Sequence, residues 1–113
     1  MKYSDFYLAF EDKFRGSSKD VNEKLVFYDG FLQEIISRFP QCNLLDVGCG
    51  RGEWLIKCTE LGINSIGIDN NESMRDICLE KGLNIKYGEA LEILKTFQNN
   101  SFHIISSFHF IEH

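Results

Sequence analysis

The stretch "LLDVGCGRGEW", residues 44–54, combines residue types that can hold a ligand against the protein main chain. Gly48, Gly50 and Gly52 alternate with other residues after an apolar run, and a helical pattern begins at Glu53. Such a turn lets a ligand approach the backbone closely, and the helix that follows offers unpaired N–H groups to an anionic group. A tight turn that serves only packing is the alternative reading of the same glycines.

Carboxylates accompany this turn. Asp46 lies inside the apolar run, Asp69 ends "SIGID", and Glu89 follows "NIKYG". A carboxylate at the end of a strand in an open α/β sheet can bind ribose hydroxyls, although Asp69 can instead cap the next helix, in competition with Asn70 and Asn71. Several carboxylates around one cleft favour a ligand with an amino or sulfonium charge over a pyrophosphate. A nicotinamide-dependent oxidoreductase stays an alternative, although G-x-G-x-G departs from the usual G-x-G-x-x-G.

Segments that alternate between strand-like and helix-like patterns must position these groups. Short apolar strands are predicted over residues 43–48, 64–69, 84–88 and 102–108, and helices are predicted between them over 53–62, 71–82 and 89–97. This alternation predicts an α/β fold with a parallel sheet covered on both faces.

Two helices are predicted before the first of these strands. Residues 3–14 carry apolar side chains at helical spacing, and a capping-box pattern at Asp20 opens a longer helix that Pro40 ends. We therefore expect an N-terminal helical cap over residues 1–40 and an α/β domain over residues 41–113.

Composition limits the class of protein. The chain has 113 residues, 43% of them hydrophobic, which suffices for one packed domain. A formal net charge of −5 argues against nucleic acid or an anionic membrane surface as the main partner, and no apolar run is long enough for a membrane span. The four cysteines form no CxxC pair, so we expect no metal site and free thiols in a reducing cytoplasm.

Four stretches, "LLDVGCGRGEWL", "SIGIDNNESM", "YGEALEIL" and "FHIISSFHFIEH", resemble successive motifs of class I S-adenosylmethionine-dependent methyltransferases in order and spacing. The opening "YLAFEDKFRG" looks like the N-terminal region of bacterial methyltransferases associated with polysaccharide biosynthesis. The resemblance implies a Rossmann-like sheet with strand order 3-2-1-4, S-adenosylmethionine as cofactor, and methyl transfer to an acceptor, by analogy a saccharide.

The resemblance also implies which residues hold the cofactor. Asp46 would reach its amino group directly or through water, Asp69 would bind the ribose hydroxyls, and Glu89 would lie near the exocyclic amine of adenine. In chain order, the positions placed against the cofactor are Asp46, Gly48, Cys49, Gly50, Gly52, Asp69, Asn70, Glu89, Ala90, Ser107 and Phe108.

Further residues have two readings each. Tyr7, Arg15 and Lys24 either close over the cofactor, or serve as an aromatic core residue and two solvated charges. His109 and His113 lie where a general base would sit if the acceptor must lose a proton, or belong to a structural stretch.

The family's sheet continues with further strands that contribute to the acceptor site, whereas this chain ends at His113. We therefore expect a truncated cofactor-binding domain whose strand over residues 102–108 is an exposed apolar edge, open to self-association. Two readings stay open: a methyltransferase, or a catalytically inactive module that binds the cofactor.

Overall fold

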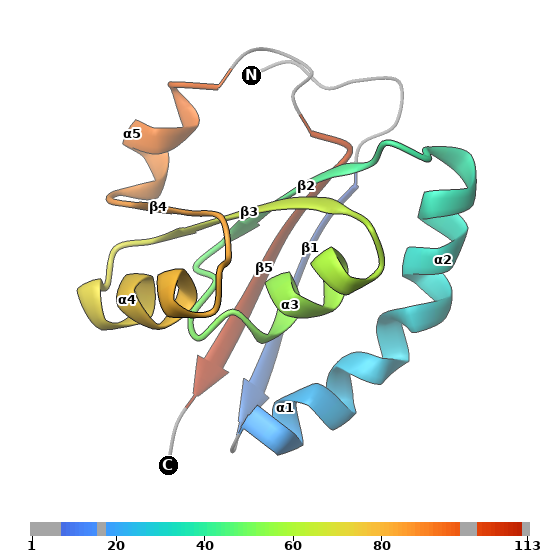
Figure 1. The fold of residues 1–113 in the computed structure, drawn as a ribbon, viewed down its shortest axis with the longest axis horizontal. Coiled ribbons are helices and arrows are strands. Elements are labelled where there is room, and N and C mark those ends of the chain that lie inside the picture. Colours follow the sequence, from blue (N-terminus) through green and yellow to red (C-terminus); the bar gives the residue numbers. More distant parts are fainter. Residues whose placement is uncertain (1–7, 16–17, 98–101, 112–113) are drawn as a thin grey trace.

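A computed structural model describes residues 8–15, 18–97 and 102–111, which form a parallel sheet flanked by helices (Figure 1). The sheet has five strands in the order β1-β5-β2-β3-β4, and every pairing is parallel. The strands are β1 (Leu8–Arg15), β2 (Asn43–Val47), β3 (Asn64–Asp69), β4 (Ile85–Tyr87) and β5 (Ile104–Ile111).

Helices connect these strands. They are α1 (Ser18–Leu25), the 3-10 helix η1 (Val26–Tyr28), α2 (Asp29–Arg38), α3 (Glu53–Glu60), α4 (Glu72–Glu80) and α5 (Ala90–Leu94). The helices α1, α2 and α3 bury their apolar sides on one face of the sheet, against Leu44, Ile104 and Phe108. The opposite face carries Leu45 and packs against α5. Because adjacent leucines of β2 enter different cores, this strand reads as an apolar run without alternation.

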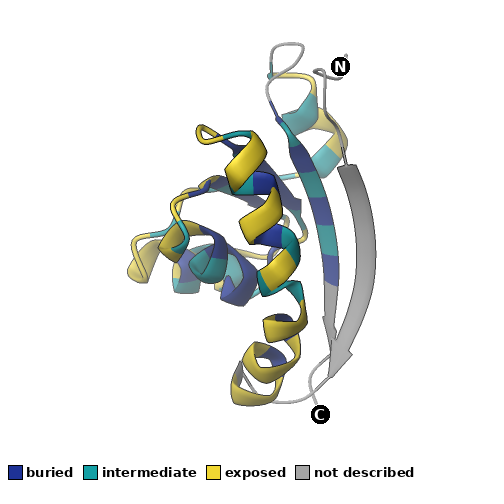
Figure 2. Ribbon diagram, turned by 90° about the vertical axis from the view of Figure 1, so that its right-hand side faces the viewer, coloured by how far each residue is buried: buried dark blue, intermediate teal, exposed yellow. Residues whose placement is uncertain are grey.

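The central part of the sheet confirms the sequence prediction. Counted from the glycine turn, the four predicted strands are β2, β3, β4 and β5, and they lie side by side in the order 3-2-1-4. Buried and half-buried residues alternate along β5 from Ile104 to Phe108 (Figure 2). This alternation places Ile104, Ser106 and Phe108 on the face that α3 covers.

The predicted helix over residues 3–14 is wrong for its described part, because Leu8–Arg15 forms β1. This strand pairs with β5 from Leu8 opposite Ile104 to Arg15 opposite Ile111. The segment has apolar residues at helical spacing and also, at Leu8 and Phe10, at a spacing of two. Pairing with β5 supplies a full ladder of backbone hydrogen bonds, which a helix at this position would not give to β5.

The same pairing corrects the expected exposed edge. β1 pairs with β5 on the side away from β2, so the strand over residues 102–108 has a neighbour on both sides (Figure 1). Self-association of the chain stays a prediction, but the exposed edge of β5 that motivated it is not present in the described sheet. Residues 18–38 are helical as predicted, although η1 interrupts the longer helix, and the division of the chain at residue 40 stays a prediction.

Candidate functional site

The glycine turn joins β2 to α3 in left-handed backbone conformations. The φ angles of Gly48, Gly50 and Gly52 are 75°, 58° and 89°. At Gly52 a Cβ atom would lie 2.5 Å from Leu83 Cδ1 and 3.1 Å from Cys78 Sγ, so both conformation and packing require glycine. The turn therefore has the left-handed backbone that favours glycine, and Gly52 also serves packing; close approach of a ligand to this turn stays a prediction.

Asp69 holds this turn against the end of β3. Its Oδ2 accepts a hydrogen bond from the Gly50 N–H at 2.9 Å, and its Oδ1 accepts one from the Asn71 N–H at 2.9 Å. The cap of α4 is Asn71, whose Oδ1 accepts from the Met74 N–H at 3.2 Å. The structure thus assigns the cap of α4 to Asn71, while Asp69 bridges the two loops; ribose binding by Asp69 stays a prediction.

A cavity of about 230 Å³ opens beside this bridge, at the carboxyl ends of β2, β3 and β4. Carboxylates, apolar side chains and two glycines line it, which suits a nucleoside-sized fragment better than a whole dinucleotide. The lining residues are Val47, Gly48, Ile68, Asp69, Asn70, Gly88, Glu89 and Ala90. Five predicted positions from three separate motifs therefore meet at one hollow.

Asp46 lies deeper, in a buried polar group that sequence reasoning found only in part. It faces Ser106 in the register of β2 and β5, and the Ser106 hydroxyl donates to Asp46 Oδ1 at 2.9 Å. Trp54 Nε1 donates in turn to Ser106 Oγ at 2.9 Å. Burial raises the pKa of Asp46 well above its usual range, while the Ser106 hydrogen bond lowers it and the negative charge of Asp69 raises it. Period-two spacing along β5 could have indicated that one of Ser106 and Ser107 faces Asp46, and the packing against α3 selects Ser106.

The neighbouring predicted residues take other places. Phe108 is buried in the core, with its ring centroid 4.7 Å from that of Trp54. Ser107, next to Phe108 in the strand, is half-buried. Cys49 packs with Leu55 and Cys78 behind the glycine turn. Hydrogen bonding to Cys78 and burial raise the pKa of the Cys49 thiol, so it stays protonated.

The remaining predicted residues are only partly described. Lys24 is exposed in the last turn of α1. Arg15 ends β1, and His109 lies on β5 opposite Lys13. Tyr7 and His113 fall outside the described residues.

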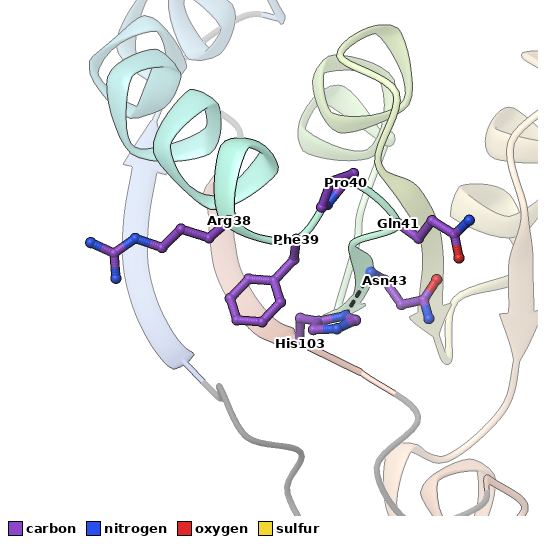
Figure 3. A pocket seen from close by; sticks show the side chains of 6 residues that line it. All are labelled: Arg38, Phe39, Pro40, Gln41, Asn43 and His103. Atoms are coloured by element: carbon purple, nitrogen blue, oxygen red, sulfur yellow. Dashed lines mark hydrogen bonds between the residues drawn. The ribbon is translucent and has the colours of Figure 1, made fainter.

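A larger cavity of about 590 Å³ lies at the other end of the sheet, where β2 begins (Figure 3). Arg38, Phe39, Pro40, Gln41, Asn43 and His103 line it. The Asn43 N–H donates to His103 Nδ1 at 3.1 Å, so this histidine holds the starts of two strands together (Figure 3). Ligands of open α/β sheets bind outside the carboxyl ends of the strands, so the smaller cavity is the better candidate site.

Two further findings concern the described residues alone. They include no group of three or more His, Cys, Asp or Glu side chains arranged to hold a metal ion. None of their helices has the length and apolarity that crossing a membrane requires.

Solved structures of methyltransferases resemble this fold. A SAM-dependent methyltransferase from Archaeoglobus fulgidus is 39% identical with a TM-score of 0.60, and the match covers 73% of this chain and 34% of that one. Two structures of WbdD, one described as a bifunctional kinase-methyltransferase, are 19% identical with TM-scores of 0.66 and 0.63, and each match covers 76% of this chain and 21% of WbdD. The chain thus spans about a third or less of these proteins, and no curated protein matches it. The family model described as a methyltransferase domain matches residues 5–113, and the chain therefore belongs to this family.

Proposed function

We propose that this chain forms the S-adenosylmethionine-binding part of a methyltransferase. The observation that carries the proposal is the bridge from Gly50 N–H to Asp69 Oδ2, beside a cavity that Glu89 and Ala90 also line. Family membership and the similarity to the Archaeoglobus fulgidus enzyme support the choice of cofactor.

The residues fit the parts of this cofactor. A carboxylate offers about four lone-pair sites, so Asp69 can accept from the ribose hydroxyls while it keeps its two backbone N–H partners. Glu89 at the cavity wall is suited to the exocyclic amine of adenine. The buried carboxylate of Asp46, two residues before Gly48, is suited to the ammonium group of the amino-acid portion.

S-adenosylmethionine, once bound, supplies an already activated methyl group. The chain's contribution is to hold the cofactor in place and to exclude water around it. Correct alignment of cofactor and acceptor then lowers the barrier to methyl transfer. Ser107 is proposed to line the site near the methyl group. A general base is needed only for an acceptor that must lose a proton, and His109 and His113 are the proposed candidates.

The finer assignments extend this proposal. A saccharide is the proposed acceptor, by analogy with the resemblance of "YLAFEDKFRG". A cytoplasmic location is proposed because the four buried cysteines are free thiols, which a reducing compartment preserves.

Calorimetric titration with S-adenosylhomocysteine tests the proposal, with NAD as the competing ligand. Micromolar binding of S-adenosylhomocysteine, weakened about tenfold or more by Asp69→Ala, is expected because charge-assisted hydrogen bonds are lost. Asp76→Ala, which removes an exposed carboxylate on α4, is the matched control and should bind like the wild-type chain. A folded chain that binds only NAD, or neither ligand, overturns the proposal.

A further inference from the structure

Trp54, Ser106 and Asp46 form a chain of hydrogen bonds whose direction is determined by chemistry. The three side chains come from α3, β5 and β2, and each of the two hydrogen bonds measures 2.9 Å. An indole N–H can only donate, so the Ser106 oxygen must accept from Trp54. When Asp46 is ionised, the single hydroxyl proton of Ser106 is therefore directed to Asp46 Oδ1.

This arrangement is also held rigidly. Trp54 and Asp46 are 0% exposed and Ser106 is 1% exposed. The rings of Tyr28 and Phe108 pack against the indole, with centroids at 5.5 and 4.7 Å. Because Asp46 and Ser106 are register partners in adjacent strands, the sheet itself holds them at hydrogen-bonding distance.

The other oxygen of the carboxylate is left for a ligand. Asp46 Oδ2 is buried and has no hydrogen-bond partner among the described residues. The glycine turn and α3 carry two cationic residues, and both form ion pairs with other carboxylates. Arg51 pairs with Glu53, and Lys57 pairs with Asp29. A buried carboxylate oxygen without a partner is costly, and a cationic N–H donor from a ligand removes that cost.

We propose that Trp54 and Ser106 are positioning residues, which occupy Asp46 Oδ1 so that Oδ2 is presented to the ammonium group of the cofactor's amino-acid portion. This inference rests on the proposed function, because the ammonium group belongs to the proposed cofactor. It assigns no chemical step to either residue: both act through Asp46. It predicts that their effect is confined to ligands that carry the ammonium group.

Two ligands separate positioning from a structural role. S-adenosylhomocysteine carries the amino-acid portion, and 5′-methylthioadenosine lacks it. Ser106→Ala is expected to weaken S-adenosylhomocysteine about tenfold and to leave 5′-methylthioadenosine within about twofold, since a hydrogen bond to a charged group is lost. Trp54→Phe keeps the aromatic packing but frees the hydroxyl, so it should give a smaller loss with the same selectivity.

Two further variants serve as controls. Ser106→Thr retains the hydroxyl and should restore affinity for S-adenosylhomocysteine. Ser65→Ala removes another buried serine hydroxyl, one that donates to Ile63 O, and should leave both affinities unchanged. Circular dichroism verifies that each variant is folded, and Trp54→Phe carries the comparison if Ser106→Ala unfolds the chain.

The outcomes separate this inference from the proposed function. A wild-type chain that binds neither ligand overturns both. A wild-type chain that binds both ligands, while Ser106→Ala and Trp54→Phe weaken neither or weaken both equally, overturns the positioning role and leaves the proposed function standing. Selective loss of S-adenosylhomocysteine, restored by Ser106→Thr, supports the positioning role.

Discussion

Asp46→Asn should change how the free energy of unfolding depends on pH. Burial raises the pKa of Asp46 in the folded chain well above its usual range, whereas the unfolded chain has an ordinary value of about 3.9. Between these two values the folded state holds a proton that the unfolded state has released. The contribution of Asp46 to stability is therefore fully present below the unfolded pKa and is lost as the pH rises through the folded pKa.

The magnitude follows from proton linkage. One such group lowers the free energy of unfolding by at most about 1.4 kcal/mol per pH unit within that window. Asparagine does not ionise, so Asp46→Asn should lack this slope. The substitution also places a buried amide donor at the position of Oδ2, which has no partner among the described residues, and costs about 1–3 kcal/mol at every pH. The pH-independent cost of the substitution and the loss of the pH-dependent slope can therefore be measured separately.

Urea unfolding followed by fluorescence measures both quantities, because Trp54 is the chain's single tryptophan and is fully buried. Measurements at intervals of about one unit, from about pH 4 to about pH 7, cover the window in which the unfolded group ionises first. Subtracting the two profiles removes the titration of shared groups, and Asp76→Asn controls for the change in net charge. Parallel profiles of wild type and Asp46→Asn would refute the reasoning, because burial would then impose no penalty on the charged carboxylate.

Three other substitutions test the packing around the site by urea unfolding. Gly67→Ala should cost about 1–3 kcal/mol, since its Cβ would lie 2.6 Å from Leu55 Cδ1 and 2.7 Å from Cys49 Sγ; an unchanged midpoint would contradict this packing. Asn71→Ala should cost about 1 kcal/mol through loss of the α4 cap, whereas Asn71→Asp should keep it; equal losses in the two would argue against a capping role. His103→Ala should cost about 1–2 kcal/mol because the Asn43 N–H loses its acceptor. An unchanged midpoint in His103→Ala would speak against this bond.

The glycine turn and the strands around it were predictable from sequence because their signals are local. Continuous apolar runs indicate strands buried on both faces, and Gly62 and Gly82 mark the ends of α3 and α4. The alternation of strands and helices predicted a parallel sheet, and the resemblance to the methyltransferase family implied the order of β4, β3, β2 and β5 within it. The carboxyl ends of neighbouring strands meet at one edge, which is why Asp69 and Glu89 were predictable as neighbours.

Other features depend on contacts that no local pattern encodes. Residues 8–15 carry apolar side chains at spacings compatible with a helix and with a strand, and pairing with β5 decides between them. Ser106 and Ser107 are adjacent serines, and only the packing of β5 against α3 determines which of them meets Asp46. By itself, then, the sequence determined the strands of the central sheet and the residues at its carboxyl edge, because periodicity reports local burial. Tertiary structure decided the role of β1 and the partners of Asp46, because those contacts join residues far apart in the chain.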